Sequence, residues 1–168
     1  KTVKSLAKEI YQLTKISVQE PIHILLSGGN TPALLFRKLS SKYQADIDWE
    51  RVHFWWGDER CVSPESDQSN FKAANDLLFS AILIPAENIH RIRGEEDPEK
   101  EAIRYSEEIK ASLNFRGDSP VFDLVILGLG EDGHTASIFP DEIELFEDER
   151  ICAVTSHPLS GQKRITLN

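Results

Sequence analysis

The stretch that decides the fold is FDLVILGLGEDGHTASIFP, from Phe122 to Pro140. It begins with an apolar run typical of a buried strand, continues into a turn that holds three glycines, and brings a histidine to the start of an expected helical turn. The turn GLGEDG, at 128–133, fits the G-x-G-x-x-G spacing of dinucleotide-binding loops. The sequence therefore raises two alternatives, a loop that holds a nucleotide and a loop that presents His134.

The place of this loop in the chain argues against a dinucleotide. The fingerprint normally occupies the first strand-to-helix turn of its fold, whereas here it comes late, and Pro140 follows soon after the last glycine. The glycines instead allow a close-approaching backbone to bring Asp132 and His134 to the edge of the sheet. Dipoles at a helix start favour neutral imidazole, and its ordinary pKa of about 6.5 suits a general base. Asp132 then either orients His134 or contacts the substrate.

Outward from this stretch, apolar strands alternate with amphipathic helices. Thr31 is the expected cap of the second helix, with Pro32 at its first position. Near-continuous apolar strands between helices are typical of an α/β domain with an open, mostly parallel sheet and helices on both faces, as in Rossmann-like folds. The expected helices are 2–15, 32–43, 67–83 and 97–113, and the expected strands are 22–26, 51–56, 89–92, 122–128, 151–155 and 164–168.

Length and composition restrict the class of protein. The 168 residues suit one α/β domain, 1–168, and a net charge of -9 disfavours nucleic acid and anionic membranes as partners. Two cysteines without paired spacing, no apolar run of membrane-spanning length and no signal-peptide block indicate a cytoplasmic protein. The sequence contains no methionine and stops in a strand-like run, so we expect residues missing at both ends. It predicts no oligomeric state.

Two further loops follow predicted strands, and ligands of open parallel sheets bind beyond the carboxyl ends of the strands. In SGGNTP, at 27–32, Gly28 and Gly29 allow close backbone approach, while Ser27, Asn30 and Thr31 add side-chain donors. The helix that follows favours a bound anion such as phosphate. The alternative is a tight capped turn with only a structural role.

The loop GDERCV, at 57–62, brings charged residues to a strand tip. Arg60 can bind a phosphate or carboxylate, and Asp58 can hold a hydroxyl or accept a proton. The alternative is a cluster of surface salt bridges. Asp58, Glu59, Asp132 and His134 also suggest a metal, but no zinc-type spacing occurs, so we expect no required metal. Cys61 has no adjacent base in the sequence and is expected to be a packing residue.

Taken together and in this order, SGGNTP, WWGDERCV and LGLGEDGHTASIFP resemble the signature blocks of the 6-phosphogluconolactonase family. The closing KRITLN resembles a fourth block, so the resemblance runs from Leu26 to the end of the chain. It implies the open α/β sheet of the sugar-phosphate isomerase and deaminase type. It also implies hydrolysis of 6-phosphogluconolactone in the oxidative pentose phosphate pathway, with a small sugar-phosphate lactone as partner and no cofactor.

The resemblance also implies roles for individual residues. His134 would be the general base with Asp132 beside it, Arg60 would bind the phosphate, and Gly28, Gly29, Asn30 and Thr31 would surround the substrate. Arg164 is a weaker substrate-side candidate. The family normally supplies a further basic residue beyond R-I-T-L. Two alternatives stay open, a glucosamine-6-phosphate deaminase-type isomerase, whose downstream Asn-Glu block is missing here, and a non-catalytic sugar-phosphate sensor.

Overall fold

The computed structural model describes residues 2–16 and 20–168 and has a four-stranded parallel sheet at its centre. The strand order is β4–β2–β1–β7, and β1 pairs with β2 in register from Ile22 opposite Val52 to Leu26 opposite Trp56. The predicted open parallel sheet is confirmed. The strands are β1 (Ile22–Leu26), β2 (Val52–Trp56), β4 (Ile89–His90) and β7 (Leu124–Val125).

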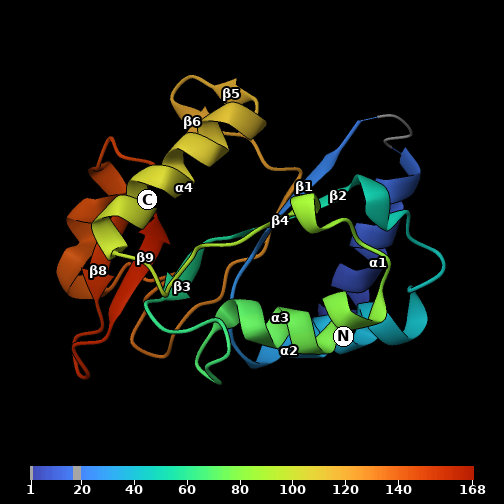
Figure 1. Ribbon diagram of the computed structural model, residues 1–168, viewed down its shortest axis with the longest axis horizontal. Coiled ribbons are helices and arrows are strands. Elements are labelled where there is room, and N and C mark those ends of the chain that lie inside the picture. Colours follow the sequence, from blue (N-terminus) through green and yellow to red (C-terminus); the bar gives the residue numbers. More distant parts are fainter. Residues whose placement is uncertain (1, 17–19) are drawn as a thin grey trace.

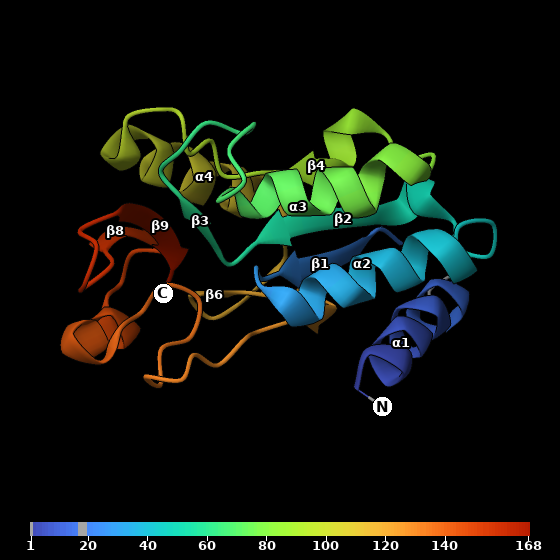
Figure 2. The ribbon, with the colours of Figure 1, turned by 90° about the horizontal axis from the view of Figure 1, so that it is seen from below.

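Helices cover this sheet from two sides. Helices α1 (Thr2–Ile16), α2 (Asn30–Lys42) and α3 (Asn70–Leu77) lie together on one side, and α4 (Pro98–Ser112) lies on the other (Figures 1 and 2). Alternate strand residues such as Ile24 and Phe54 are fully buried toward the three-helix side, where Phe54 packs on Phe79. Short 3₁₀ helices span Trp49–Arg51, Phe79–Ala81, Ala86–Asn88 and Pro140–Glu147. Within the described ranges, no helix is long and apolar enough to cross a membrane.

A second sheet is antiparallel, with the order β3–β9–β8, and it lies beside α4. Its strands are β3 (Asp58–Arg60), β8 (Cys152–Ser156) and β9 (Lys163–Leu167), and a small hairpin joins β5 (Phe115–Arg116) to β6 (Ser119–Pro120). The sequence predicted a loop at 58–60 and assigned the last two strands to the alternating parallel pattern, and both expectations were wrong. Gly57 explains the difference, because its N–H donates to Leu26 of β1 at 2.9 Å while its carbonyl accepts from Leu167 of β9 at 2.8 Å. The chain therefore passes from one sheet to the other at this residue.

The start of α2 also differs from the prediction. The helix begins at Asn30 after a Gly29 cap, so Thr31 lies inside the first turn and does not cap it. Gly29 has φ of +101°, a left-handed conformation that glycine adopts far more readily than other residues. The second glycine of SGGNTP is thus required by the helix cap itself. The helix expected over 67–83 is shorter, because α3 ends at Leu77 and a 3₁₀ turn follows.

The apolar run at 122–128 is not the buried strand that its composition suggests. Only Leu124 and Val125 pair, with β1, and they form the edge of the sheet. Val125 is 46% exposed and Leu127 is 54% exposed. Apolar composition indicates that a strand is buried only when neighbours cover it, and β7 has a paired strand on one side alone.

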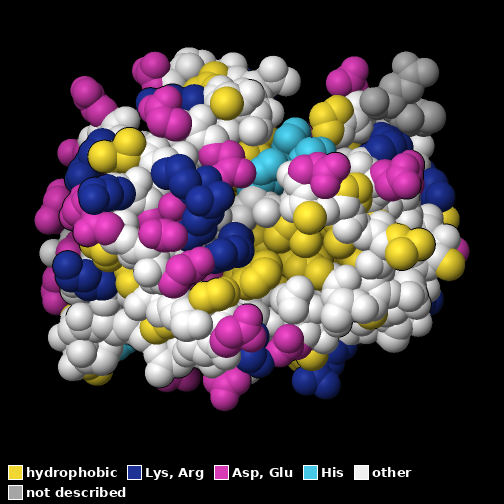
Figure 3. Space-filling view, viewed as in Figure 1, with side chains coloured by type: hydrophobic (Ala, Val, Ile, Leu, Met, Phe, Trp, Pro, Cys, Tyr) yellow, Lys and Arg dark blue, Asp and Glu magenta, His cyan; other side chains and the backbone are white. Residues whose placement is uncertain are grey.

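A cluster of three histidines lies on the sheet face opposite the α1–α3 layer. His23, His53 and His90 come from adjacent strands, and Nδ1 of His53 lies 2.9 Å from Nε2 of His90. The His90 ring stacks on Trp55 with a centroid distance of 3.8 Å. Figure 3 shows histidine side chains gathered in one hollow of the surface. Burial, followed by the neighbouring imidazoles, lowers the pKa of His53 to about 4, and burial also lowers the pKa of His23.

This cluster predicts a loss of stability on mild acidification. Because the folded-state pKa of His53 lies below the 6.5 of a free imidazole, the unfolded chain binds a proton first as the pH falls. The contribution of neutral His53 to the free energy of unfolding is complete above pH 6.5 and disappears progressively toward pH 4. Between pH 7.5 and 5 we expect wild type to lose about 1–2 kcal/mol more unfolding free energy than His53→Gln, allowing for partial solvent screening.

The measurement is urea unfolding of both proteins at the two pH values. The comparison with His53→Gln is needed because Glu87, Glu108 and Asp123 also face the cluster and titrate in acid. Equal losses in the two proteins would assign the acid sensitivity to these carboxylates instead.

Candidate active site

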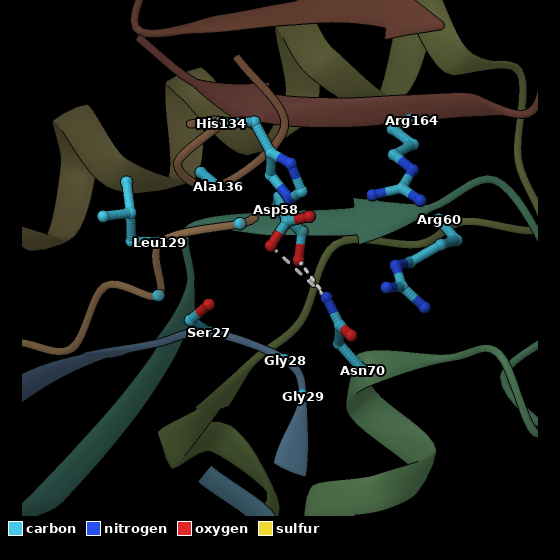
Figure 4. Close-up of a pocket in the computed structure, with 12 residues that line it drawn as sticks. Ser27, Gly28, Gly29, Asp58, Arg60, Asn70, Leu129, His134, Ala136 and Arg164 are labelled. Carbon is cyan, nitrogen blue, oxygen red and sulfur yellow. Dashed lines mark hydrogen bonds between the residues drawn. The ribbon is translucent and has the colours of Figure 1, made fainter. Parts of the chain in front are cut away.

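A cavity of about 180 Å³ lies where the two sheets meet, beyond the carboxyl ends of β1 and β2 (Figure 4). It brings together residues from all three glycine-rich or charged segments singled out in the sequence, together with the first residue of α3 and one residue of β9. The lining residues are Ser27, Gly28, Gly29, Asp58, Arg60, Asn70, Gly128, Leu129, Gly130, His134, Ala136 and Arg164.

The His134 side chain points into this cavity (Figure 4). Its Nδ1 lies 2.5 Å from Oδ1 of Asp132, and this hydrogen bond is the main reason that the pKa of Asp132 is lowered. An ionised Asp132 can only accept, so the proton of a neutral imidazole sits on Nδ1 and a lone pair remains on Nε2. Throughout residues 2–16 and 20–168, nothing forms a hydrogen bond with that Nε2.

The loop around His134 is held by backbone turns and contains no helix. Gly133 has φ of +91° and Ala136 has φ of +49°, and both values interrupt a right-handed helix, so the predicted helical turn at His134 is wrong. The argument that helix dipoles keep this imidazole neutral therefore fails. Gly130 donates its N–H to the carbonyl of His134 at 2.8 Å. A Cβ at Gly130 would lie 2.3 Å from the imidazole ring and 2.6 Å from Oδ1 of Asp132, so a side chain at this position would displace the His134–Asp132 pair.

Two arginines form the other end of the cavity. Arg60 and Arg164 are cross-strand partners on β3 and β9, so their side chains leave the same face of the second sheet (Figure 4). Burial, and then the charge of Arg60, lowers the pKa of Arg164. Neither guanidinium forms an ion pair with any described residue, and the Nε atoms of both are buried without a partner. Two neighbouring guanidinium groups that form no ion pair are suited to binding an anion, although the charges of Asp58 and Glu59 partly offset the charge of Arg164.

Asp58 lies beside these arginines but is bonded to neutral groups. It is 4% exposed, and its Oδ2 accepts from the Ser137 hydroxyl at 2.6 Å. The amide of Asn70 donates to its Oδ1 at 3.4 Å and to its backbone carbonyl at 3.0 Å. Ser137 also accepts a hydrogen bond of 3.4 Å from Arg164. Asp58 is therefore held in place by neutral partners and forms no ion pair with either arginine, although its charge acts on Arg164.

The SGGNTP segment lines the cavity in part. Ser27, Gly28 and Gly29 line it, whereas Asn30 and Thr31 are exposed in the first turn of α2 and do not. The contact of these two residues with substrate stays a prediction. Neither of their backbone N–H groups forms a hydrogen bond with another described residue, as expected at a helix start.

The other candidate chemistries find little support in the geometry. Across the two described ranges, no group of three or more histidine, cysteine, aspartate or glutamate side chains could hold a metal ion. Glu59 is buried, and its carboxylate accepts four hydrogen bonds, from the Ser69 hydroxyl and from the backbone N–H groups of Arg60, Asn70 and Phe71. These bonds at the start of α3 leave the carboxylate no capacity to bind a metal. Burial raises the pKa of Cys61 to about 11, which is unsuited to a thiolate nucleophile.

Sequence reasoning missed two residues of this site. Asn70 belongs to no motif and lies twelve positions after Asp58, so the only local signal is Ser69, the cap of the following helix. Ser137 stands in the block GLGEDGHTASIFP but received no role there, because it is completely buried and its contact with Asp58, 79 positions away, is created only by the fold.

The comparisons with known proteins agree with one another. The chain matches the family described as glucosamine-6-phosphate isomerases/6-phosphogluconolactonase over residues 1–168. It is 47% identical to the 6-phosphogluconolactonase of Haemophilus influenzae over 165 residues, which are 98% of this chain and 68% of that protein. A crystal structure named devB protein superposes with a TM-score of 0.94 at 47% identity and covers 99% of this chain and 69% of its own.

A crystal structure of 6-phosphogluconolactonase from Thermotoga maritima superposes with a TM-score of 0.84 at 33% identity, covering 99% of this chain and 72% of its own. This chain thus spans somewhat more than two thirds of the length of these relatives. The family match over every residue and the shared fold lead to one conclusion. The chain belongs to the glucosamine-6-phosphate isomerase/6-phosphogluconolactonase family.

Proposed function

We propose that this protein hydrolyses 6-phosphogluconolactone to 6-phosphogluconate in the cytoplasm, as a step of the oxidative pentose phosphate pathway. One observation supports the proposal most strongly: an imidazole whose Nε2 has no partner among the described residues and a pair of arginines without ion pairs line the same cavity. The imidazole is suited to activating a water that attacks an ester, and the arginines are suited to binding a phosphate at a distance from that ester.

Binding begins at the arginine end of the cavity. Arg60 and Arg164 hold the phosphate by charge-assisted hydrogen bonds, and the start of α2 adds a favourable dipole. Binding of the phosphate places the lactone carbonyl near His134, so the reacting groups are already oriented for hydrolysis.

The chemistry then needs one base and one water. Nε2 of His134 takes a proton from the water, whose oxygen forms a bond to the lactone carbonyl carbon. The ring carbon–oxygen bond breaks in the next step, and the same nitrogen returns the proton to the leaving alkoxide. Asp132 orients the ring and stabilises the transient imidazolium through its 2.5 Å hydrogen bond to Nδ1. The reaction needs no redox cofactor and no covalent intermediate.

The developing oxyanion requires fixed donors close to His134. Gly128 and Leu129 line the cavity, and their backbone N–H groups form no hydrogen bond with another described residue. Because they are held by the chain before substrate arrives, they stabilise negative charge without further reorganisation.

The test is a lactonase assay on freshly generated 6-phosphogluconolactone, corrected for spontaneous hydrolysis. We expect catalysed turnover, and no release of ammonia from glucosamine-6-phosphate. Ammonia release without lactone turnover would favour the deaminase-type activity. Binding of 6-phosphogluconate without turnover of its lactone would favour a sensor.

A further inference from the structure

Asn70 presents a hydrogen-bond acceptor whose direction is set by chemistry. Its amide nitrogen donates to the backbone carbonyl of Asp58 at 3.0 Å and to Oδ1 of Asp58 at 3.4 Å (Figure 4). The backbone carbonyl can only accept, and Oδ1 of an ionised Asp58 can only accept as well. A flipped amide would therefore place oxygen against oxygen. Nδ2 therefore faces Asp58, and Oδ1 of Asn70 faces away from it.

This Oδ1 atom has no donor of its own. Asn70 is 5% exposed and lines the cavity, yet no described residue donates a hydrogen bond to its Oδ1. Oδ1 is also not one of the side-chain polar atoms that are closed off from solvent without a hydrogen-bond partner. It lies against the backbone of Gly28, where an added Cβ would be 2.0 Å away. A carbonyl oxygen in a buried polar wall is costly unless a donor reaches it.

Asn70 is also fixed firmly in place. Its backbone N–H donates to Oε1 of Glu59 at 2.8 Å, and Oε2 of Glu59 accepts from Ser69 at 3.0 Å and from Phe71 at 2.8 Å. Glu59 is 2% exposed, so these bonds are shielded from water. The start of α3 is thereby attached to β3, which carries Asp58 and Arg60, and the amide is preorganised toward the cavity.

We infer that Asn70 is a substrate-binding residue whose Oδ1 accepts a hydrogen bond from one hydroxyl of the sugar ring, and that it selects substrates carrying that hydroxyl. This inference rests on the proposed function for the identity of the ligand. The arginines can only donate and His134 is needed for water, so acceptors for the ring hydroxyls come from the rest of the lining. There the carboxylate of Asp58 already accepts from Ser137 and Asn70, whereas Oδ1 of Asn70 has no donor among the described residues. A neutral amide supplies it without repelling the phosphate, as a carboxylate at this position would.

The experiment compares kcat/KM for 6-phosphogluconolactone and its 2-deoxy, 3-deoxy and 4-deoxy analogues in wild type and Asn70→Ala. Wild type is expected to disfavour one deoxy analogue by about 10-fold or more. In Asn70→Ala that preference should fall to within about 2-fold, because the acceptor for the hydroxyl is gone. Asn75→Ala, at an exposed position of the same helix, is the matched control and should retain the wild-type preference.

An equal loss on all four substrates, with the preference intact, would show that Asn70 only supports Asp58 and would overturn the inference. If Asn70→Ala does not fold, Asn70→Ser removes the same carbonyl with a residue tolerated at a helix start. Calorimetric binding of 6-phosphogluconate and its deoxy forms separates the two proposals. Binding with the same Asn70-dependent preference but without turnover contradicts the proposed function and supports Asn70, whereas neither binding nor turnover contradicts both.

Discussion

His134→Ala is expected to lower kcat by about 10²–10⁴-fold, the usual contribution of a positioned general base. KM should change little, because the phosphate contacts proposed for Arg60 and Arg164 remain. The fold should also persist, because His134 lies in an irregular loop and packs mainly on the Phe139 ring, with 5.0 Å between centroids. Initial rates above the spontaneous reaction, together with a thermal unfolding midpoint, measure both expectations.

The matched control is His157→Ala. His157 contacts the same Phe139 ring at 5.3 Å but does not line the cavity, so its removal tests the packing loss without the chemistry. We expect nearly wild-type turnover from it. A His134→Ala protein that retains most of its kcat would exclude this imidazole as the base.

Arg60→Ala is expected to raise KM by about 10–100-fold with a smaller change in kcat, since a charge-assisted hydrogen bond to phosphate contributes about 1.5–3 kcal/mol to binding. The folded protein should not become much less stable. The substitution loses the 2.7 Å hydrogen bond from Arg60 to the Gln68 carbonyl, but it also removes a like charge from beside Arg164.

Steady-state kinetics and thermal unfolding give the two readouts. Arg37→Ala serves as the control, because it removes the same charge from an exposed position of α2 away from the cavity lining. An unchanged KM in Arg60→Ala would place the phosphate elsewhere in the protein.

Local patterns were sufficient to predict most elements of the central sheet. The apolar runs of β1 and β2, and the Asp97–Pro98 start of α4, depend on neighbours in sequence, and the structure has them where the sequence predicted. The second sheet was not predictable in this way. Its pairing of β3 with β9 joins residues more than a hundred positions apart, and no local pattern in either segment indicates so distant a partner.

The residues of the candidate site were predictable where they stand in local motifs, and not where they depend on tertiary contacts. His134, Arg60, Asp58 and the two glycines stand in motifs directly after strands, so the rule for open sheets brings them to one cavity. The roles of Asn70 and Ser137 depend on tertiary contacts with Asp58, and no spacing in the chain indicates these contacts.

Gly57 restricts how the geometry of this site can vary. Its N–H belongs to the parallel ladder and its carbonyl to the antiparallel one, so a single peptide segment sets the offset between the two ladders. The position of Arg60 and Arg164 relative to the carboxyl end of the central sheet is then a property of main-chain geometry. Replacements in the outer helices can change the rate of thermal inactivation, while the position of the two arginines relative to the central sheet stays constant.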